Sequence, residues 1–126
     1  MPYTRNMDIE KSLENWNVQA RKGVLELCIL NALGAERLYG YDIVKRLRVV
    51  DGLVIGEGTI YPILSRFRTQ GLVAVELEES SGGPARKYHR LTARGEKVLA
   101  RMNAAWDQIE AGIRSLRKGE ADGRAD

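Results

Sequence analysis

Apolar residues recur along the N-terminal part of this chain at helical spacing, three or four positions apart. The first stripe is narrow and predicts a helix that Asp8 caps and that ends at Lys22-Gly23. Its apolar members are Ile9, Leu13, Trp16 and Ala20. Residues 23–35 are apolar on nearly every side, so we expect a second helix at the centre of the domain, stopped by Gly34.

Two shorter helical patterns follow in the sequence. The first predicts a helix that opens at Tyr39 and turns Ile43, Val44 and Leu47 inward. The second predicts a helix over residues 59–70. Its inner side is formed by Ile60, Ile63, Leu64 and Phe67. Pro62 has no amide hydrogen, so we expect it near the start of this helix, and we expect Gly71 as the C-terminal cap.

Strict alternation replaces the helical period after Gly71. Three apolar residues alternate with Ala74, Glu76 and Glu78, which predicts a half-buried strand. The apolar members are Val73, Val75 and Leu77. Residues 80–84 predict a turn and residues 86–91 a returning strand, so the two strands form a small β-hairpin.

The last apolar series is spaced three, four, three, four and three, and it predicts a long helix over residues 93–117 with Thr92 as its N-cap. Its members, which we call the seam, are Leu99, Met102, Trp106, Ile109, Ile113 and Leu116. So narrow a seam is typical of helices that pair lengthwise. We therefore expect a homodimer held by the seam together with Ile9, Leu13 and Trp16 of the N-terminal segment.

This order of elements predicts a fold that is mainly α with a small β-hairpin, namely a winged helix-turn-helix with an N-terminal helix and a long C-terminal dimerisation helix. We divide the chain into four parts: an N-terminal arm and helix that belong to the dimer interface, a DNA-binding domain, the dimerisation helix and a polar disordered tail. The boundaries are 1–21, 22–92, 93–117 and 118–126.

Composition adds a modest positive charge that is locally concentrated. The 126 residues carry a formal net charge of +3, and the isoelectric point is about 9.2. Between Arg86 and Arg101 the sequence has six basic residues and one acidic residue, which favours a nucleic-acid partner. Cys28 is the only cysteine, so no intrachain disulfide can form. Neither a signal peptide nor a membrane span is evident, and we expect a cytoplasmic protein.

Outward polar residues on the predicted winged domain are candidates for contact with double-stranded DNA. On the third helix they are Thr59, Tyr61, Ser65 and Arg66, with Arg68 as a phosphate contact. In the wing, Arg86 and Lys87 are expected to meet the backbone or the minor groove. Tyr39, Tyr41 and Lys45 of the second helix are phosphate candidates, although both tyrosines suit packing equally well. The alternative for all of these residues is an ordinary solvated face.

The same residues resemble a known family over positions 22–116. The resemblance rests on four segments, LELCILNALG, YGYDIVKRL, GTIYPILSRFRTQGLV and RKYHRLTARGEKVL. They are similar to the corresponding segments of the PadR-type transcriptional regulators. The resemblance implies a cytoplasmic dimeric repressor, with a C-terminal dimerisation helix and a response to small aromatic ligands. The single short C-terminal helix is similar to the shorter subgroup. His89 departs from the pattern, because a second aromatic residue such as tyrosine is expected there.

Two tryptophans and a methionine are candidates for an effector site. Trp16, Met102 and Trp106 suit either core packing in a dimer or a pocket for a small planar hydrophobic effector. The segment Gly56-Glu57-Gly58 does not qualify as a dinucleotide fingerprint, because the third glycine and the βαβ unit are missing. No cluster of histidine and cysteine supports a metal, a cofactor or a catalytic site, so we expect no enzyme.

The sequence thus predicts a sequence-specific transcriptional regulator, acting as a homodimeric repressor on a pseudo-palindromic operator and relieved by a small aromatic or hydrophobic effector. A winged-helix module for protein–protein interaction, without DNA binding, is the alternative.

Overall fold

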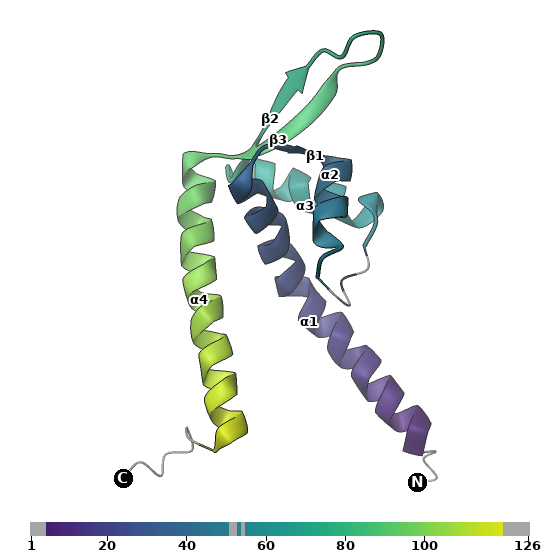
Figure 1. Ribbon diagram of the computed structural model, residues 1–126, viewed down its shortest axis with the longest axis vertical. Coiled ribbons are helices and arrows are strands. Elements are labelled where there is room, and N and C mark those ends of the chain that lie inside the picture. The colour runs from purple at the N-terminus through teal and green to yellow at the C-terminus, as the bar shows by residue number, and fades with distance from the viewer. Residues whose placement is uncertain (1–4, 51–52, 54, 120–126) are drawn as a thin grey trace.

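The computed structural model describes residues 5–50, 53 and 55–119, with side chains from Asp8 onward. Two long helices diverge as legs from one end of a small body, and a β-hairpin projects from the other end (Figure 1). The elements are α1 (Arg5–Ala35), β1 (Leu38–Tyr39), α2 (Gly40–Leu47), α3 (Glu57–Thr69), β2 (Val73–Glu78), β3 (Arg86–Leu91) and α4 (Ala93–Lys118). The mainly α fold with a winged helix-turn-helix and a long last helix is therefore confirmed.

α1 is one continuous helix, so the predicted break at Lys22-Gly23 is wrong. A glycine inside a helix costs about 1 kcal/mol relative to alanine. The next turns recover more than that, because four of their apolar side chains are buried in the core. They are Leu25, Ile29, Leu30 and Leu33. Asp8 lies within the helix, which already runs from Arg5, and is not its cap.

The core gathers the inner faces of all the elements. The inward side chains predicted for α2 and α3 are buried or partly buried as expected. The buried set is Leu25, Ile29, Leu30, Leu33, Leu38, Ile43, Val44, Leu47, Leu53, Ile60, Leu64, Phe67, Leu72, Val73, Leu91 and Leu99. Leu99, the first residue of the predicted dimer seam, thus belongs to the core of its own chain.

α3 begins at Glu57, two residues before its predicted start. Pro62 is consequently the sixth residue of the helix, one turn inside it, and the hydrogen bond to the Gly58 carbonyl cannot form there. Gly71 has φ of 77° and ends the helix as predicted. The amide of Leu72 donates to the Phe67 carbonyl at 2.9 Å and that of Gly71 to Arg68 at 3.0 Å, which is the Schellman pattern.

Three antiparallel strands, in the order β1-β3-β2, form the sheet. β1 was not predicted from the sequence, and it places Tyr39 in a strand instead of at the start of α2. It pairs Leu38 with His89 and Tyr39 with Tyr88. The hairpin runs beyond the core, so Leu77, which was expected to face inward, is 68% exposed.

α4 starts where the sequence predicts and ends one residue later. The Thr92 hydroxyl accepts a hydrogen bond from the Gly95 amide at 3.0 Å, which confirms the N-cap. The helix ends at Lys118, followed by Gly119 in the left-handed region. The rest of the expected tail, residues 120–126, and the leading residues 1–4 lie outside the described part of the chain.

Candidate nucleic-acid interface

α3 and the wing enclose a small cavity that gathers several of the predicted DNA contacts. Tyr61, Ser65 and Arg68 are spaced by four and three residues, which places them on one face of α3. Across from them, β3 contributes Lys87 and His89. The cavity has a volume of about 230 Å³. A hydroxyl, a phenol and two cationic groups thus meet in one concave place.

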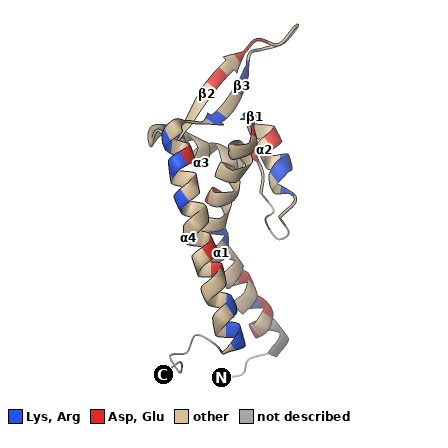
Figure 2. Ribbon diagram, turned by 60° about the vertical axis from the view of Figure 1, so that its left-hand side comes forward, with Lys and Arg blue, Asp and Glu red and all other residues tan. Residues whose placement is uncertain are grey.

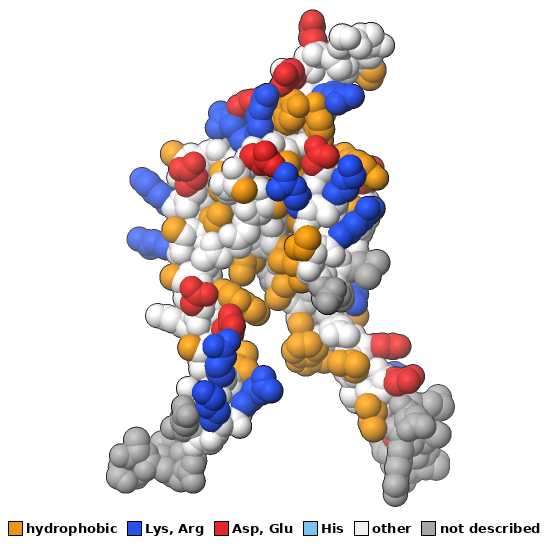
Figure 3. All heavy atoms as spheres, in the orientation of Figure 1, with side chains coloured by type: hydrophobic (Ala, Val, Ile, Leu, Met, Phe, Trp, Pro, Cys, Tyr) orange, Lys and Arg blue, Asp and Glu red, His pale blue; other side chains and the backbone are white. Residues whose placement is uncertain are grey.

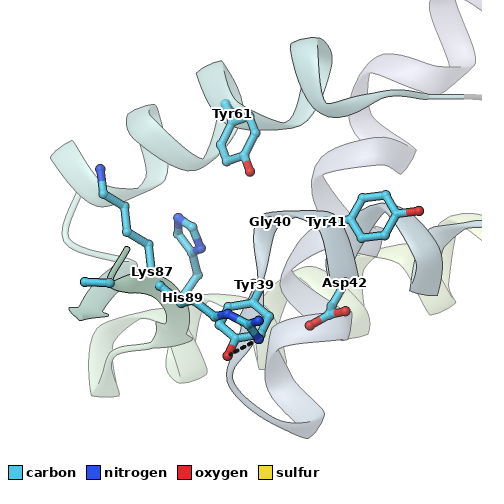
Figure 4. Close-up of a pocket in the computed structure, with 9 residues that line it drawn as sticks. Tyr39, Gly40, Tyr41, Asp42, Tyr61, Lys87 and His89 are labelled. Carbon is cyan, nitrogen blue, oxygen red and sulfur yellow. Dashed lines mark hydrogen bonds between the residues drawn. The ribbon is translucent and has the colours of Figure 1, made fainter. Parts of the chain in front are cut away.

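A second, larger cavity of about 580 Å³ opens between the start of α2, Tyr61 of α3 and the first half of β3 (Figure 4). Its lining comprises Tyr39, Gly40, Tyr41, Asp42, Tyr61, Ala85, Arg86, Lys87 and His89. Because Tyr61, Lys87 and His89 border both cavities, the two adjoin. The structure therefore brings together seven of the ten predicted DNA contacts, from the four elements β1, α2, α3 and β3.

Arg86 and Lys87 lie on opposite faces of the hairpin, because successive side chains of a strand alternate. Lys87 faces α3. Arg86 turns toward β1, where its guanidinium donates to the Tyr39 hydroxyl at 3.3 Å and lies 5.2 Å from the Tyr39 ring centre. The two basic residues therefore cannot approach the same phosphate from the same face of the hairpin.

Tyr61 lies where the two cavities meet. Its ring lies against the backbone of Gly40 at the start of α2, while 46% of the residue remains exposed. Burial, and secondarily the Glu57 carboxylate, raises the pKa of Tyr61. The hydroxyl consequently keeps its proton at neutral pH and is available as a hydrogen-bond donor.

The other three predicted contacts are placed elsewhere. Arg66 turns toward α1, where its guanidinium forms an ion pair with Glu26 at 3.0 Å. Thr59 lies two turns before Arg66 on the same flank of α3 and is exposed. Lys45, on α2, lies over the Tyr41 ring at 5.2 Å. None of the three lines either cavity.

Sequence reasoning identified Ser65 but not the other three residues of an exposed row along α3, which we call the crest. Gly58, Pro62, Ser65 and Thr69 follow one another at spacings of four, three and four, and all four are exposed. Thr69 turns its hydroxyl back to the Ser65 carbonyl, at 3.1 Å. The crest therefore carries only small side chains, which permits close approach of the helix to a flat surface. These four positions recur at helical spacing, so examining the small and polar positions as well as the apolar ones would have identified the crest.

The acidic residues of β2 are neutralised on the face of the wing that points away from Lys87. Arg37, just before β1, reaches Glu76 at 3.2 Å and Glu78 at 2.8 Å, and its guanidinium lies 4.0 Å from the Tyr88 ring centre. Arg90 pairs with Glu76 at 2.5 Å. Figure 2 shows these opposite charges along the two strands. As a result, the acidic run does not confront the face that bears Lys87.

His89 is a buried residue of the sheet and not an exposed wing contact. It is 6% exposed, and its Nδ1 has no hydrogen-bond partner among the described residues. Burial lowers the pKa of His89, partly offset by the Leu38 backbone, and nearby Lys87 and Arg68 lower it further. The side chain is therefore neutral at pH 7.

The legs carry the predicted dimer residues. Figure 3 shows apolar side chains along the inner sides of both legs. The exposed ones are Ile9, Leu13, Trp16, Trp106, Ile109, Ile113 and Leu116. Met102 is partly buried against the core.

Of the three predicted effector residues, only Met102 and Trp106 share a hollow, a groove of about 390 Å³ between α1 and α4. Trp16 lines a separate hollow with Val50 and Leu53. The chain on its own therefore does not assemble the predicted pair of tryptophans.

A sequence profile of the family described as "Transcriptional regulator PadR-like family" matches residues 29–101, more than half of the chain. The chain belongs to this family. Its members are transcriptional regulators, not enzymes. No match was found among curated proteins.

Solved structures agree with the PadR assignment. A PadR family regulator from Eggerthella lenta is 34% identical with a TM-score of 0.75, and the alignment covers 87% of this chain and 96% of that one. For a PadR-like regulator from Bacillus cereus the values are 36%, 0.73, 81% and 99%. Bacillus subtilis PadR, solved in complex with operator DNA, is 25% identical with a TM-score of 0.56, covering 61% of this chain and 45% of that one.

Within the described residues, no helix is both long and apolar enough to cross a membrane. Nor do three or more His, Cys, Asp or Glu side chains gather there as metal ligands.

Proposed function

We propose that this PadR-family protein binds double-stranded DNA sequence-specifically, as a homodimeric repressor. The observation that carries the proposal is the joint site of α3 and the wing, where Tyr61, Ser65 and Arg68 face Lys87 across one cavity. A helix for the major groove beside a basic hairpin for the flanking backbone is the arrangement that a duplex reader requires. The operator complex of Bacillus subtilis PadR supports the same use of the fold.

The small crest of α3 sets the closest approach to the bases. Ser65 lies on the crest, and Tyr61 and Arg68 flank it, so these three side chains reach the base edges or the adjoining phosphates. Lys87 neutralises a phosphate beside them, and Arg86 does so from the other face of the hairpin. Arg66 and Thr59 contact the duplex from the far flank of α3, where a phosphate replaces Glu26 as the partner of Arg66.

Tyr39 of β1, together with Tyr41 and Lys45 of α2, acts at the phosphate backbone. Tyr39 and Tyr41 line the larger cavity, and Lys45 lies against Tyr41. A first helix that crosses the backbone in this way fixes the register of the second helix without reading sequence.

The legs form the dimer. Both expose apolar side chains along their length, and their free ends carry opposite charge. α1 has acidic Asp8, Glu10 and Glu14 near its start, and α4 has basic residues near its end. A second copy can therefore cover the apolar stripes while pairing these charges across a twofold axis. Two recognition helices then meet half-sites about 10 base pairs, or a multiple of that, apart.

The groove between α1 and α4 is the proposed effector site. It is predominantly apolar and includes the Trp106 ring and the pliable Met102, which suits a small planar hydrophobic molecule. An occupant there changes the separation of the legs and so the separation of the two recognition helices. Release from the operator follows from that change.

DNA binding is tested by fluorescence anisotropy with a labelled duplex selected from a random pool by the wild-type protein, and with a scrambled duplex. Lys87→Ala and Arg68→Ala are each expected to weaken binding by about 1–3 kcal/mol. Lys22→Ala removes the same charge from an exposed position of α1, outside the basic stretch between Arg86 and Arg101, and should change binding little. The wild-type affinity should fall steeply with salt, because phosphate neutralisation releases counterions.

If the wild-type protein shows no preference for any selected duplex, even at low salt, the proposal of sequence-specific DNA binding is wrong. The interaction module without DNA binding then becomes the better account.

A further inference from the structure

Gly40 and Tyr61 fit together so closely that a side chain at position 40 would collide with the Tyr61 ring where it now lies. A Cβ placed on Gly40 would lie 2.5 Å from the Tyr61 hydroxyl oxygen and 2.6 and 2.7 Å from two ring carbons. Gly40 is buried, and it is the first residue of α2. The Tyr61 phenol of α3 therefore packs directly against the backbone at the start of α2 (Figure 4).

Backbone conformation does not explain the glycine. Among the described residues, the glycines with positive φ are Gly71, Gly82 and Gly119, and Gly40 is not one of them. Alanine is therefore compatible with the backbone at position 40, and it is a better helix former than glycine. The three atoms nearest to an added Cβ all belong to the Tyr61 side chain.

The obstacle at position 40 can move. At Gly95, by contrast, an added Cβ would lie 2.1 Å from the backbone carbonyl oxygen of Leu72, which is fixed by the fold. At Gly40 the nearest atoms belong to the far end of a side chain that is 46% exposed. A methyl group there would turn the Tyr61 ring away toward solvent and leave the core as it is.

We propose that Gly40 is a positioning residue that fixes the Tyr61 ring for DNA readout, an inference that rests on the proposed function. The bare backbone of Gly40 allows the ring to lie against the start of α2, where Tyr61 borders both cavities. Fixed there, Tyr61 presents a single orientation to the duplex. The contact between Tyr61 and the duplex contributes to sequence preference more than to general attraction to phosphate.

The test compares wild type, Gly40→Ala, Tyr61→Ala and the double variant in anisotropy titrations with the selected and scrambled duplexes. Gly40→Ala is expected to weaken binding to the selected duplex by about five- to a hundredfold, the range for one lost specific contact. Binding to the scrambled duplex should change by less than about twofold, because the phosphate contacts remain. The double variant should bind like Tyr61→Ala alone, since the methyl group has nothing left to displace.

Gly112→Ala is the matched control. No atom outside its own helix lies within 4 Å of a Cβ at this exposed position of α4. It should bind both duplexes like wild type. NMR signals of the Tyr61 ring should shift in Gly40→Ala and stay in place in Gly112→Ala.

Five outcomes are decisive. Wild-type affinity and preference in Gly40→Ala would overturn the inference, and so would additive losses in the double variant. If Gly40→Ala fails to fold, refolding in the Tyr61→Ala background would support the contact, and continued unfolding would overturn it. A wild-type protein that does not discriminate between the duplexes would overturn the proposed function itself and the inference with it.

Discussion

A single methyl group should have opposite effects at two glycines of α4. Gly95 lies where a Cβ would come within 2.1 Å of the Leu72 carbonyl oxygen, whereas Gly112 has open space. Gly95→Ala should lower the free energy of unfolding by about 3 kcal/mol, because the backbone of the α3–β2 turn must shift. Gly112→Ala should raise it by up to about 1 kcal/mol through helix propensity. Urea unfolding followed by circular dichroism measures both, and equal effects would contradict the close approach.

His89 should make stability depend on pH. Its pKa is lowered by burial, so the unfolded chain binds the proton more tightly than the folded chain does. The contribution to stability is complete above the unfolded pKa and is lost as the pH falls through the folded pKa. The urea concentration at the midpoint of unfolding should therefore decrease as the pH is lowered from 7 to 5.

The matched variant for that measurement is His89→Gln, which cannot titrate. Because His89 is the only histidine of the chain, its removal should flatten the profile over this interval. A slope that persists unchanged in His89→Gln would assign the effect to other groups.

Among the elements, α4 is joined to the end of α3 through the Thr92 side chain. The Thr92 hydroxyl accepts from the Gly95 amide and donates to the Gly71 carbonyl at 2.6 Å, so it joins the helix start to the end of α3. Thr92→Ala should lower the free energy of unfolding by about 1–2 kcal/mol. Thr92→Ser keeps the hydroxyl and should lose much less. Thermal unfolding compares the two, and equal losses would exclude the cap as the cause.

The amphipathic elements were predictable because their signal is local. The bounds of β2, β3 and α4 follow from period and cap residues, and those of α2 and α3 do so to within two residues. The continuity of α1 was not predictable, because packing of Leu25 and the turns after it outweighs the local cost of Gly23. β1 has only two residues, and its pairing with β3 spans about fifty positions of sequence.

The candidate site was predictable in its membership and less so in its geometry. Helical and strand positions identified Tyr61, Ser65, Arg68 and Lys87 as outward residues, and the structure brings these four together. The pairing of Arg66 with Glu26 joins residues that are forty positions apart and leaves no periodic trace. The same is true of the contact between Tyr61 and Gly40, which depends on the crossing of two helices.

For the whole molecule, the exposed apolar side chains of α1 and α4 predict that a single charge added among them weakens the dimer. Ile113→Glu in the full chain should shift a dimer toward monomer by at least about 3 kcal/mol, since burying each aliphatic side chain contributes about 1.5–3 kcal/mol and a twofold interface contains the position twice. Ala111→Glu adds the same carboxylate to the opposite side of α4. Sedimentation velocity distinguishes them, and an intact Ile113→Glu dimer would exclude the seam.

The unbroken α1 also acts as a lever. Its 31 residues span about 46 Å, with an exposed foot at one end and core side chains such as Ile29 near the other. No joint along the helix absorbs a rotation, so wherever the foot is held, a turn of about five degrees carries the far end through about 4 Å. That displacement is of the order of one base-pair step, enough to move α3 from one register of a duplex toward the next.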